Sequence, residues 1–558
     1  MLSKEKMIEI ENLYFKYSKD KEDTLKGINL SVDEAEMVLI AGKTGCGKST
    51  LLKVINGVLV GNKSLIKGVI KLNGLNANIM STEDIGLLIG TVYQTPADQL
   101  FAMTVEDEVG FVLEAHGVEP EIIKNAVSTT LKKVGLDGLE KAVIHTLSGG
   151  QVQRLALASV IVNKPKVLIL DEPVSQLNPK GVKQFIKLLK KLNLEEKMTI
   201  IVIEHRVNEL AEYFKRLVFM KKGRIVFDGN INEAWSVVGN QLESGLREPQ
   251  NVKLCRFLKL SKLSMNLNET TDLISKECTL KKENRNSNES FQIENVGANT
   301  VLKVENLSFI YPGKKTKTLK NINFNLFEGE IVAVMGFNGA GKSTLFNLIA
   351  GLNSSTGGKL TFLGNELSKN VHKIGFLRQE ADLMLLADTV FEEIKWNNKI
   401  ENRKVKEILE KFNLLEKAQE FPLTLSKGER LRTAFAAVLA RNPKLLLLDE
   451  PTTGQDQESL VEIKKTILDY RKNGGSVLLC THDVELASEI ASKVILMKEG
   501  EIFAIGSPLE ILSDEEKICE CGLENPPMVS VSKNLKINKC ITIKGVLNYV
   551  NEATVGRV

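Results

Sequence analysis

The chain contains two copies of one sequence pattern, and this repeat limits the folds open to it. The stretch AGKTGCGKSTLLKVINGV at 41–58 recurs as MGFNGAGKSTLFNLIAGL at 335–352. The stretch VLILDEP at 167–173 recurs as LLLLDEP at 445–451, with a shorter spacing between the two motifs in the second copy. A repeat on this scale indicates a duplicated domain.

Chain length and local composition place the domain boundaries. At 558 residues the chain is too long for one hydrophobic core. The repeat puts two domains at about 1–245 and 300–525, and the Asn-, Ser-, Lys- and Glu-rich residues 246–299 between them predict a polar linker. Within it, CRFLKLSKLSMNLN at 255–268 favours a loosely packed connector over a short docking helix. Residues 526–558 carry five basic residues and one acid, which predicts a basic, solvated C-terminal tail.

Composition excludes some partners and compartments. The 74 basic and 70 acidic residues leave a net charge of +4, which does not indicate a nucleic-acid binder. No apolar run approaches the roughly 18 to 20 residues that a spanning helix needs, so we expect no membrane insertion. The N-terminal segment lacks the apolar core of a signal peptide, and seven cysteines without a paired framework fit a reducing compartment.

Each copy contains the phosphate-loop motif G-x-x-x-x-G-K-[ST]. Each motif follows a short apolar run and opens a helical pattern, which is the strand–loop–helix context that the motif requires. The glycines let backbone N–H groups converge on phosphate oxygens, the lysine neutralises their charge and the serine binds Mg²⁺. The residues expected to hold the nucleotide are Gly42, Gly45, Gly47, Lys48, Ser49 and Thr50, and Gly336, Gly339, Gly341, Lys342, Ser343 and Thr344.

Two acids follow a buried strand in each copy. The runs VLILDE and LLLLDE predict parallel strands whose carboxyl ends lie at the ligand-binding edge of a sheet. Asp171 and Asp449 suit Mg²⁺ or its water, and Glu172 and Glu450 suit polarisation of an attacking water.

A histidine follows a further β-rich run in each copy. His205 and His482 occupy equivalent positions of the repeat, although the chain has only five histidines. A lone histidine at a strand end is usually structural. The equivalence of the two positions favours a contact with the γ-phosphate instead.

Together these motifs resemble the ATP-binding cassette (ABC) ATPases, with two cassettes in one chain. The resemblance implies an α/β fold of two tandem P-loop NTPase domains, each with a mixed sheet core, an antiparallel β subdomain and a helical subdomain. It implies ATP and Mg²⁺ as cofactors. It also implies that Tyr17 and Tyr311 stack on adenine, with a core tyrosine as the alternative, and that Gln94 and Gln379 join the metal site to a membrane partner.

The sequences LSGGQ and LSKGE match the family's signature loop. In this family the loop closes over ATP bound by the other cassette, so the resemblance implies two non-identical sites at a head-to-tail interface. Lys427 replaces Gly149, and it costs about 1 kcal/mol only if the backbone there needs a positive φ. We expect both sites to hydrolyse ATP at different rates. One site combines Lys342, Asp449 and Glu450 with Ser148 and Gly150, and the other combines Lys48, Asp171 and Glu172 with Ser426 and Gly428.

The stretch YQTPADQLFAMTVEDEVGF at 93–111 resembles a pattern of energy-coupling-factor (ECF) vitamin and metal-ion importers. The second copy, RQEADLMLLADTVFEEI at 378–394, lacks the Pro and QLF. The resemblance implies an ATP-hydrolysing subunit, peripheral on the cytoplasmic side of the membrane, that drives a membrane-embedded scaffold and a substrate-binding subunit. Two alternatives stay open: the tandem ATPase of a sugar ABC importer, and a translation-factor ABC ATPase that acts on ribosomes.

Overall fold

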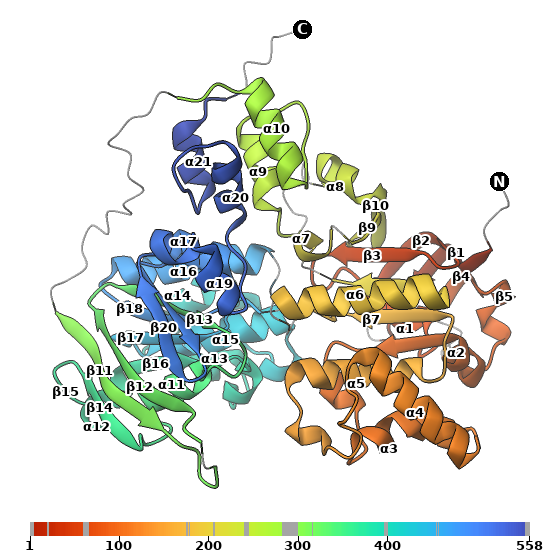
Figure 1. Cartoon of the computed structure of the whole chain (residues 1–558), viewed down its shortest axis with the longest axis horizontal. Coiled ribbons are helices and arrows are strands. Elements are labelled where there is room, and N and C mark those ends of the chain that lie inside the picture. Colours follow the sequence, from red (N-terminus) through yellow and green to blue (C-terminus); the bar gives the residue numbers. More distant parts are fainter. Residues whose placement is uncertain are drawn as a thin grey trace. The chain divides into compact units, whose positions relative to one another are not determined.

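In a computed structural model of the chain, the two sequence copies fold as two units, Met1–Pro249 and Gln250–Val558 (Figure 1). Among the residues that the structure describes, no helix is both long and apolar enough to cross a bilayer. The described residues are 5–18, 22–59, 66–174, 177, 179–204, 207–211, 213–238, 245–281, 299–314, 316–395, 400–453, 455 and 457–552.

A six-stranded mixed sheet forms the centre of the first unit. Strands β7 and β8 are buried at every residue, as expected for parallel strands covered on both faces. Only the edge strand β10 runs antiparallel to its neighbour. In sheet order the strands are β10 (Arg224–Asn230), β9 (Arg216–Lys221), β3 (Met37–Gly42), β8 (Thr199–Ile203), β7 (Val167–Asp171) and β6 (Ile89–Val92).

The second unit repeats this sheet. Its edge strand β20 is antiparallel to β19, and the other neighbours are parallel. In sheet order the strands are β16 (Ile374–Leu377), β17 (Leu445–Asp449), β18 (Ser476–Cys480), β13 (Ile331–Gly336), β19 (Lys493–Lys498) and β20 (Glu501–Gly506).

Each unit adds a four-stranded antiparallel sheet, so the predicted fold class is confirmed. In the first unit the order is β2 (Leu25–Asp33), β1 (Lys6–Phe15), β4 (Ile66–Leu72) and β5 (Leu75–Asn76). In the second unit it is β12 (Leu319–Phe327), β11 (Thr300–Phe309), β14 (Gly357–Phe362) and β15 (Asn365–Glu366).

Each unit also has a helical subdomain, which appears in the first unit as a group of orange helices (Figure 1). Its helices are α3 (Val105–Ala115), α4 (Pro120–Val134) and α5 (Gly149–Ile161), and in the second unit α13 (Val390–Lys395), α14 (Asn402–Lys411) and α15 (Lys427–Ala440). The remaining α-helices of the cassettes are α1 (Lys48–Ile55), α2 (Thr82–Leu88), α6 (Pro179–Glu196), α7 (Val207–Leu210), α8 (Ile231–Val238), α11 (Lys342–Ile349), α12 (Leu367–Asn370), α16 (Gln457–Lys472), α17 (Val484–Ile490), α18 (Pro508–Leu512) and α19 (Glu515–Glu520).

The strand order explains why distant motifs meet. In the first unit β8 lies between β3 and β7, and in the second unit β18 lies between β13 and β17. Parallel strands present their carboxyl ends at one edge of the sheet. The phosphate loop after β13, the acid pair after β17 and His482 after β18 therefore lie side by side.

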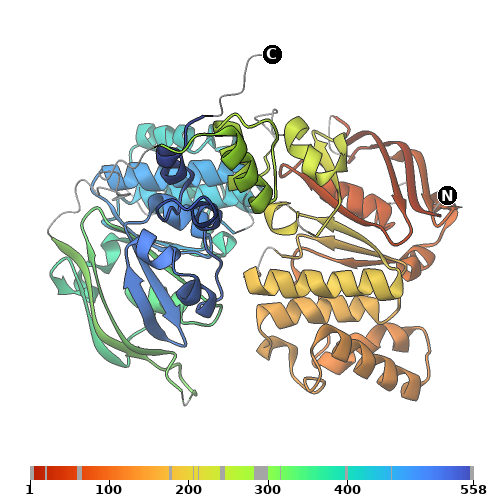
Figure 2. The same ribbon diagram turned by 45° about the horizontal axis from the view of Figure 1, so that its top comes forward.

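The expected linker and tail instead contain helices with a common core. The four helices, which we call the helical module, are α9 (Gln250–Phe257), α10 (Leu267–Glu277), α20 (Pro527–Asn534) and α21 (Ile543–Tyr549). Figures 1 and 2 both show the green α9 and α10 beside the dark blue α20 and α21. The module's core contains Leu254, Cys255, Leu258, Ile274, Met528, Val531, Leu535, Val546 and Tyr549. Composition misled the prediction because the apolar residues of the two segments are scattered among polar ones and share a core only once the segments meet.

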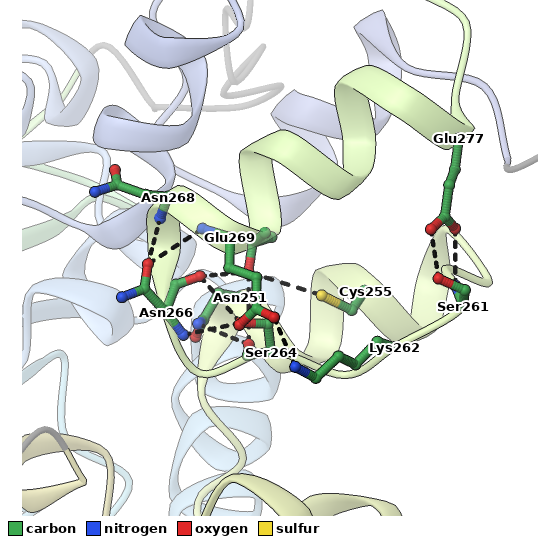
Figure 3. Close-up of polar contacts among 10 residues, drawn as sticks. Asn251, Cys255, Ser261, Lys262, Ser264, Asn266, Asn268, Glu269 and Glu277 are labelled. Carbon is green, nitrogen blue, oxygen red and sulfur yellow. Dashed lines mark hydrogen bonds and ion pairs between the residues drawn. The ribbon is translucent and has the colours of Figure 1, made fainter.

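Hydrogen bonds also order the segment expected to be a loose connector (Figure 3). Asn266 caps α10, since its Oδ1 accepts from the backbone N of Asn268 at 2.9 Å and of Glu269 at 3.1 Å. Ser264 Oγ donates to Glu269 Oε2 at 2.6 Å, and Asn251 Nδ2 donates to Ser264 O at 2.9 Å. Hydrogen bonds from Lys262 and Ser264 lower the pKa of Glu269. The segment is therefore a turn with defined side-chain contacts between α9 and α10.

The module continues the sequence repeat. GLREPQNV at 245–252 corresponds to GLENPPMV at 522–529, with a proline four residues after the glycine in both. The helices α9 and α20, which follow, each have 8 residues. Helices α9 and α10 are therefore the end of the first sequence copy, although they pack within the second unit. This local match is the signal that could have predicted them.

Candidate nucleotide-binding sites

Both phosphate loops lie between a core strand and a helix, as the motif predicts. Gly47 precedes α1 with φ 106°, and Gly341 precedes α11 with φ 97°. These are left-handed backbone angles that favour glycine. The N–H groups of a helix's first turn have no partner within the helix, so each loop can bind an anion.

The lysine of each loop is buried and bound to its own loop. A phosphate can take such a lysine from neutral carbonyl groups, because a hydrogen bond between two charged groups is stronger. Lys48 Nζ donates to Gly42 O at 2.8 Å and Lys43 O at 3.1 Å, and Lys342 Nζ donates to Gly336 O at 2.8 Å and Phe337 O at 2.9 Å.

A tyrosine lies beside each phosphate loop. The Tyr17 hydroxyl is 3.3 Å from Thr50 Oγ1, and the Tyr311 hydroxyl is 3.1 Å from Thr344 Oγ1. Both rings are half-buried, and Tyr17 meets Phe15 edge-on at a centroid distance of 4.8 Å. The tyrosines are therefore near enough to contact a bound nucleotide, and adenine stacking stays a prediction.

The strand-end aspartates provide oxygen ligands for a cation. Asp171 and Asp449 are buried at the ends of β7 and β17. Asp449 Oδ1 is buried and has no hydrogen-bond partner among the described residues. A buried carboxylate oxygen without a donor is costly unless a cation binds it, and Mg²⁺ prefers such oxygens. The second unit therefore fits Mg²⁺, with the exposed Ser343 hydroxyl as a further oxygen.

The two glutamates share an uncommon backbone conformation. Glu172 and Glu450 both have φ 50°, in the left-handed region. Their backbone N–H groups donate to Ile203 O at 2.8 Å and Cys480 O at 3.0 Å, so the neighbouring strand fixes both. Residues held in this region cluster at functional sites. The same strained position in both units supports a role beyond packing.

His482 connects the phosphate loop to Glu450. Its Nε2 lies 2.9 Å from Asn338 Oδ1 and 3.2 Å from Glu450 Oε1, so Nε2 carries the hydrogen between two acceptors. Its backbone N donates to Glu450 Oε2 at 3.3 Å. The Cys480 thiol donates to Glu450 Oε1 at 3.9 Å, and burial raises the pKa of this thiol. Asn338 was not predicted, because the motif leaves its position free. His205 lies outside the described residues.

The glutamines of the two units differ. In the first unit Gln94 Nε2 donates to Glu172 Oε2. In the second unit Gln379 is exposed and has no hydrogen bond to any residue in the described part of the chain. Among the described residues, a hydrogen bond between this glutamine and the strand-end glutamate is therefore found in the first unit alone, and the expected role of both glutamines at a metal site stays a prediction.

Each signature serine begins a helix. The Gln151 side chain accepts from Ser148 N at 2.8 Å at the start of α5. At the start of α15, Glu429 Oε2 accepts from Ser426 N at 2.9 Å and Ser426 Oγ at 2.6 Å. Burial raises the pKa of Glu429, but the hydrogen bonds from Ser426 prevail and lower it. The second signature thus adds a carboxylate directly to its serine hydroxyl.

The glycine missing from the second signature is not required there. Lys427 has no positive φ, so its substitution for Gly149 brings no backbone cost. Its side chain is exposed, and a Cβ on Gly149 would have no atom within 4 Å. Gly150 and Gly428, which both signatures keep, are the positions where the loop approaches neighbouring side chains.

Two buried carboxylates, which no motif indicates, fix the segment after each glutamine. Glu108 Oε2 accepts from the backbone N of Phe101 at 3.0 Å and of Ala102 at 2.8 Å. Glu393 Oε2 accepts in the same way from Leu386 at 2.7 Å and Ala387 at 2.8 Å. From sequence, an acidic residue in the first turns of a helix is normally expected to face solvent. These contacts are therefore evident only from the fold.

The fixed segment presents large apolar side chains. Phe101 is 65% exposed and Met103 77% exposed, and the Phe101 ring meets Phe111 edge-on at 4.6 Å. Leu386 in the second unit is 75% exposed. Gln99 donates to Thr91 O at 3.0 Å and accepts from Tyr93 N at 3.2 Å, which holds the segment against the glutamine loop. Apolar side chains gathered on a surface mark an interaction site.

Comparisons with known proteins show which family the chain resembles. A family model described as ABC transporter matches residues 25–175 and 319–453. An ABC transporter ATP-binding protein of Methanosarcina mazei is 37% identical over 554 residues, covering 95% of this chain and 94% of the relative. One from Clostridium perfringens is 33% identical over 553 residues, covering 96% and 97%. A solved structure of cbiO1 from Clostridium perfringens, part of the ABC transporter complex cbiONQ, is 34% identical, covers 42% of this chain and 91% of that chain, and has a TM-score of 0.39.

Proposed function

Because this chain belongs to the ABC transporter family, whose ATP-binding proteins hydrolyse ATP, we propose that it is the energy-coupling ATPase of an ECF-type importer for a vitamin or metal ion. It would bind peripherally to the cytoplasmic side of the membrane, on a membrane-embedded scaffold that carries a substrate-binding subunit. The observation that carries the proposal is the exposure of large apolar side chains by the segment 93–111. Its Gln99 and Glu108 hold Phe101 and Met103 outward, as a docking surface requires.

The residues at each sheet edge divide the work of ATP hydrolysis. Lys48 and Lys342 neutralise the β- and γ-phosphates, and the loop N–H groups orient them. When bound, Mg²⁺ would supply positive charge beside the phosphates, and the oxygens of Ser49, Asp171 and Gln94, and of Ser343, Asp449 and Gln379, would hold it.

The carboxylates and histidines act on the attacking water and the γ-phosphate. Glu450 accepts the proton of the attacking water, and Glu172 does the same in the first unit. The His482 Nε2–H, now shared between Asn338 and Glu450, donates to the γ-phosphate. His205 takes this role in the first unit.

The proposal includes two composite sites, in which each signature contacts the nucleotide bound by the other cassette. Double variants test the pairing, because changes within one site are not additive whereas changes at independent sites are. Adding Ser148→Ala to Lys342→Ala is expected to lower ATP hydrolysis little further. Adding Ser426→Ala to Lys342→Ala is expected to lower it much further, and the opposite pattern would assign each signature to its own cassette's nucleotide.

Co-purification from detergent-solubilised membranes tests the importer. The tagged chain is expected to recover a multi-spanning subunit, and the Phe101→Asp/Met103→Asp variant to lose it. Leu194→Asp is the matched control, because Leu194 is an exposed apolar residue of α6 in the same unit. Recovery of ribosomes instead would support the translation-factor alternative. Equal recovery by all variants would remove segment 93–111 from the docking surface.

A further inference from the structure

In each sequence copy, a glycine just before the helical module lies against that copy's own phosphate loop. Gly245 and Gly522 have left-handed backbone angles, φ +68° and +71°. Gly245 contacts Lys43, and Gly522 contacts Phe337. Lys43 and Phe337 are equivalent, since each directly follows the first glycine of its phosphate-loop motif. The contact is therefore a feature of the repeat.

In the second unit a side chain at position 522 would collide with the ring of Phe337. A Cβ on Gly522 would lie 2.1 Å from Cε1 and 2.4 Å from Cδ1 of Phe337, closer than real Cβ atoms approach. The carbonyl of Phe337 accepts the Lys342 ammonium at 2.9 Å. One residue therefore touches the distant glycine with its ring and holds the loop lysine with its backbone.

The first unit has the same chain of contacts with different residues. A Cβ on Gly245 would lie 2.6 Å from Cβ and 2.9 Å from Cα of Lys43. The carbonyl of Lys43 accepts Lys48 Nζ at 3.1 Å. The closest atoms belong to or adjoin the backbone, so they cannot move aside without moving the loop itself.

We propose that Gly245 and Gly522 are positioning residues for ATP binding. Each lets the segment leading into the helical module rest on the second residue of a phosphate loop, which sets the carbonyl that holds the lysine before nucleotide arrives. Leu523, next to Gly522, packs in a cluster with Met335 at the end of β13, so the segment supports the loop from the adjoining core. The inference rests on nucleotide binding at these loops and is independent of the proposed importer.

A glycine can instead serve only to end a helix. Gly522 follows α19, its N–H donates to Cys519 O at 3.0 Å, and Leu523 N donates to Ile518 O at 3.1 Å. Such an end needs a positive φ but no close approach. Gly474 follows α16 with φ +81°, and a Cβ added to it would have no atom within 4 Å. Gly474→Ala therefore reproduces the backbone strain of Gly522→Ala without the contact.

Binding of a fluorescent ATP analogue to the full chain tests the second unit. A Lys48→Ala background weakens the first loop, so the second dominates the titration. Gly522→Ala is expected to bind about tenfold more weakly than Gly474→Ala. Adding Phe337→Ala is expected to restore the affinity to that of Phe337→Ala alone, because the ring is the obstacle. Equal affinities of Gly522→Ala and Gly474→Ala, or no restoration, would overturn the proposal.

Two further comparisons keep the test decisive. Should Gly522→Ala fail to fold, Gly522→Ala/Phe337→Ala is compared with Gly474→Ala/Phe337→Ala, which has the same kind of backbone strain. The first double variant is expected to fold and the two affinities to be equal, because the ring is absent. Failure to fold or weaker binding by Gly522→Ala/Phe337→Ala would overturn the proposal. Binding by the Gly474→Ala control shows that the loop takes nucleotide, and failure of the importer proposal would appear only in the membrane co-purification.

The first unit gives an independent comparison with a different expectation. In a Lys342→Ala background, Gly245→Ala is expected to bind the analogue about tenfold more weakly than Gly117→Ala. Gly117 has φ +69° and open space around a built Cβ. Adding Lys43→Ala is expected to restore nothing, because alanine keeps the Cα and Cβ that Gly245→Ala meets. Restoration by Lys43→Ala would contradict the backbone contact.

Discussion

Replacing Glu108 with alanine tests the buried carboxylate that fixes the proposed docking segment. The change leaves the backbone N–H groups of Phe101 and Ala102 without their acceptor. A fully buried donor left unpaired costs about 1–3 kcal/mol. These two donors are part-buried and the segment can relax toward water, so we expect a loss of about 2–4 kcal/mol of unfolding free energy for the pair. With a urea dependence of about 2–3 kcal/mol per molar, the unfolding midpoint of the first unit should fall by about 1 M.

Tryptophan fluorescence can follow this unit selectively. The chain has two tryptophans, and a Trp396→Phe background leaves Trp235, which is buried in α8 of the first unit, as the reporter. Glu108→Gln is expected to lose less unfolding free energy than Glu108→Ala, because its amide oxygen can still accept hydrogen bonds from the two backbone N–H groups.

A surface acid provides the control for the loss of charge. Glu106 pairs with Lys141 at the surface, so Glu106→Ala is expected to cost less than about 1 kcal/mol. A Glu108→Ala midpoint within about 0.2 M of the Glu106→Ala midpoint would refute the reasoning, because a loss of 2–4 kcal/mol could not produce it.

Three further outcomes are expected. Glu172→Gln and Glu450→Gln should each lower steady-state ATP hydrolysis, and a variant with an unchanged rate would show that its site was never catalytic. Because the folded pKa of Glu429 is lowered, its stabilising contribution is present at neutral pH and lost as the pH falls through the folded pKa; melting temperatures between about pH 3 and 6 should decline less in Glu429→Gln. Ending the chain at 525 removes α20 and α21 and should lower the melting temperature, and an unchanged value would contradict the shared core.

The parts predictable from sequence are those set by local pattern. The apolar runs before Asp171 and Asp449 predicted buried strands, and the glycine-rich motifs predicted the phosphate loops. Both kinds of element depend mainly on residues that are neighbours in the sequence. The order of the parallel strands then brings the motifs to one edge of the sheet. This order was predicted from the family resemblance. These features account for the core fold and for most of the candidate nucleotide sites.

The features that sequence did not reveal depend on pairing between distant segments. Asn338 occupies a free position of its motif and gains meaning only because β18 brings His482 beside it. Glu108 looks like a solvated helix acid until the loop before it folds back onto its carboxylate. The helical module depends on a contact between segments that are far apart in the sequence. The apolar residues of α9 pack against those of α20, and neither segment alone shows this.

The way these helices pack has a consequence for a cut polypeptide. Cleavage between 281 and 299 would leave α9 and α10 on the N-terminal fragment and α20 and α21 on the C-terminal one, with Leu254 and Ile274 still enclosed beside Met528 and Val546. A protease-nicked sample should therefore run as a single particle under native conditions and separate only in denaturant. Two genes encoding the halves would, by the same reasoning, yield a heterodimer that assembles without the covalent joint.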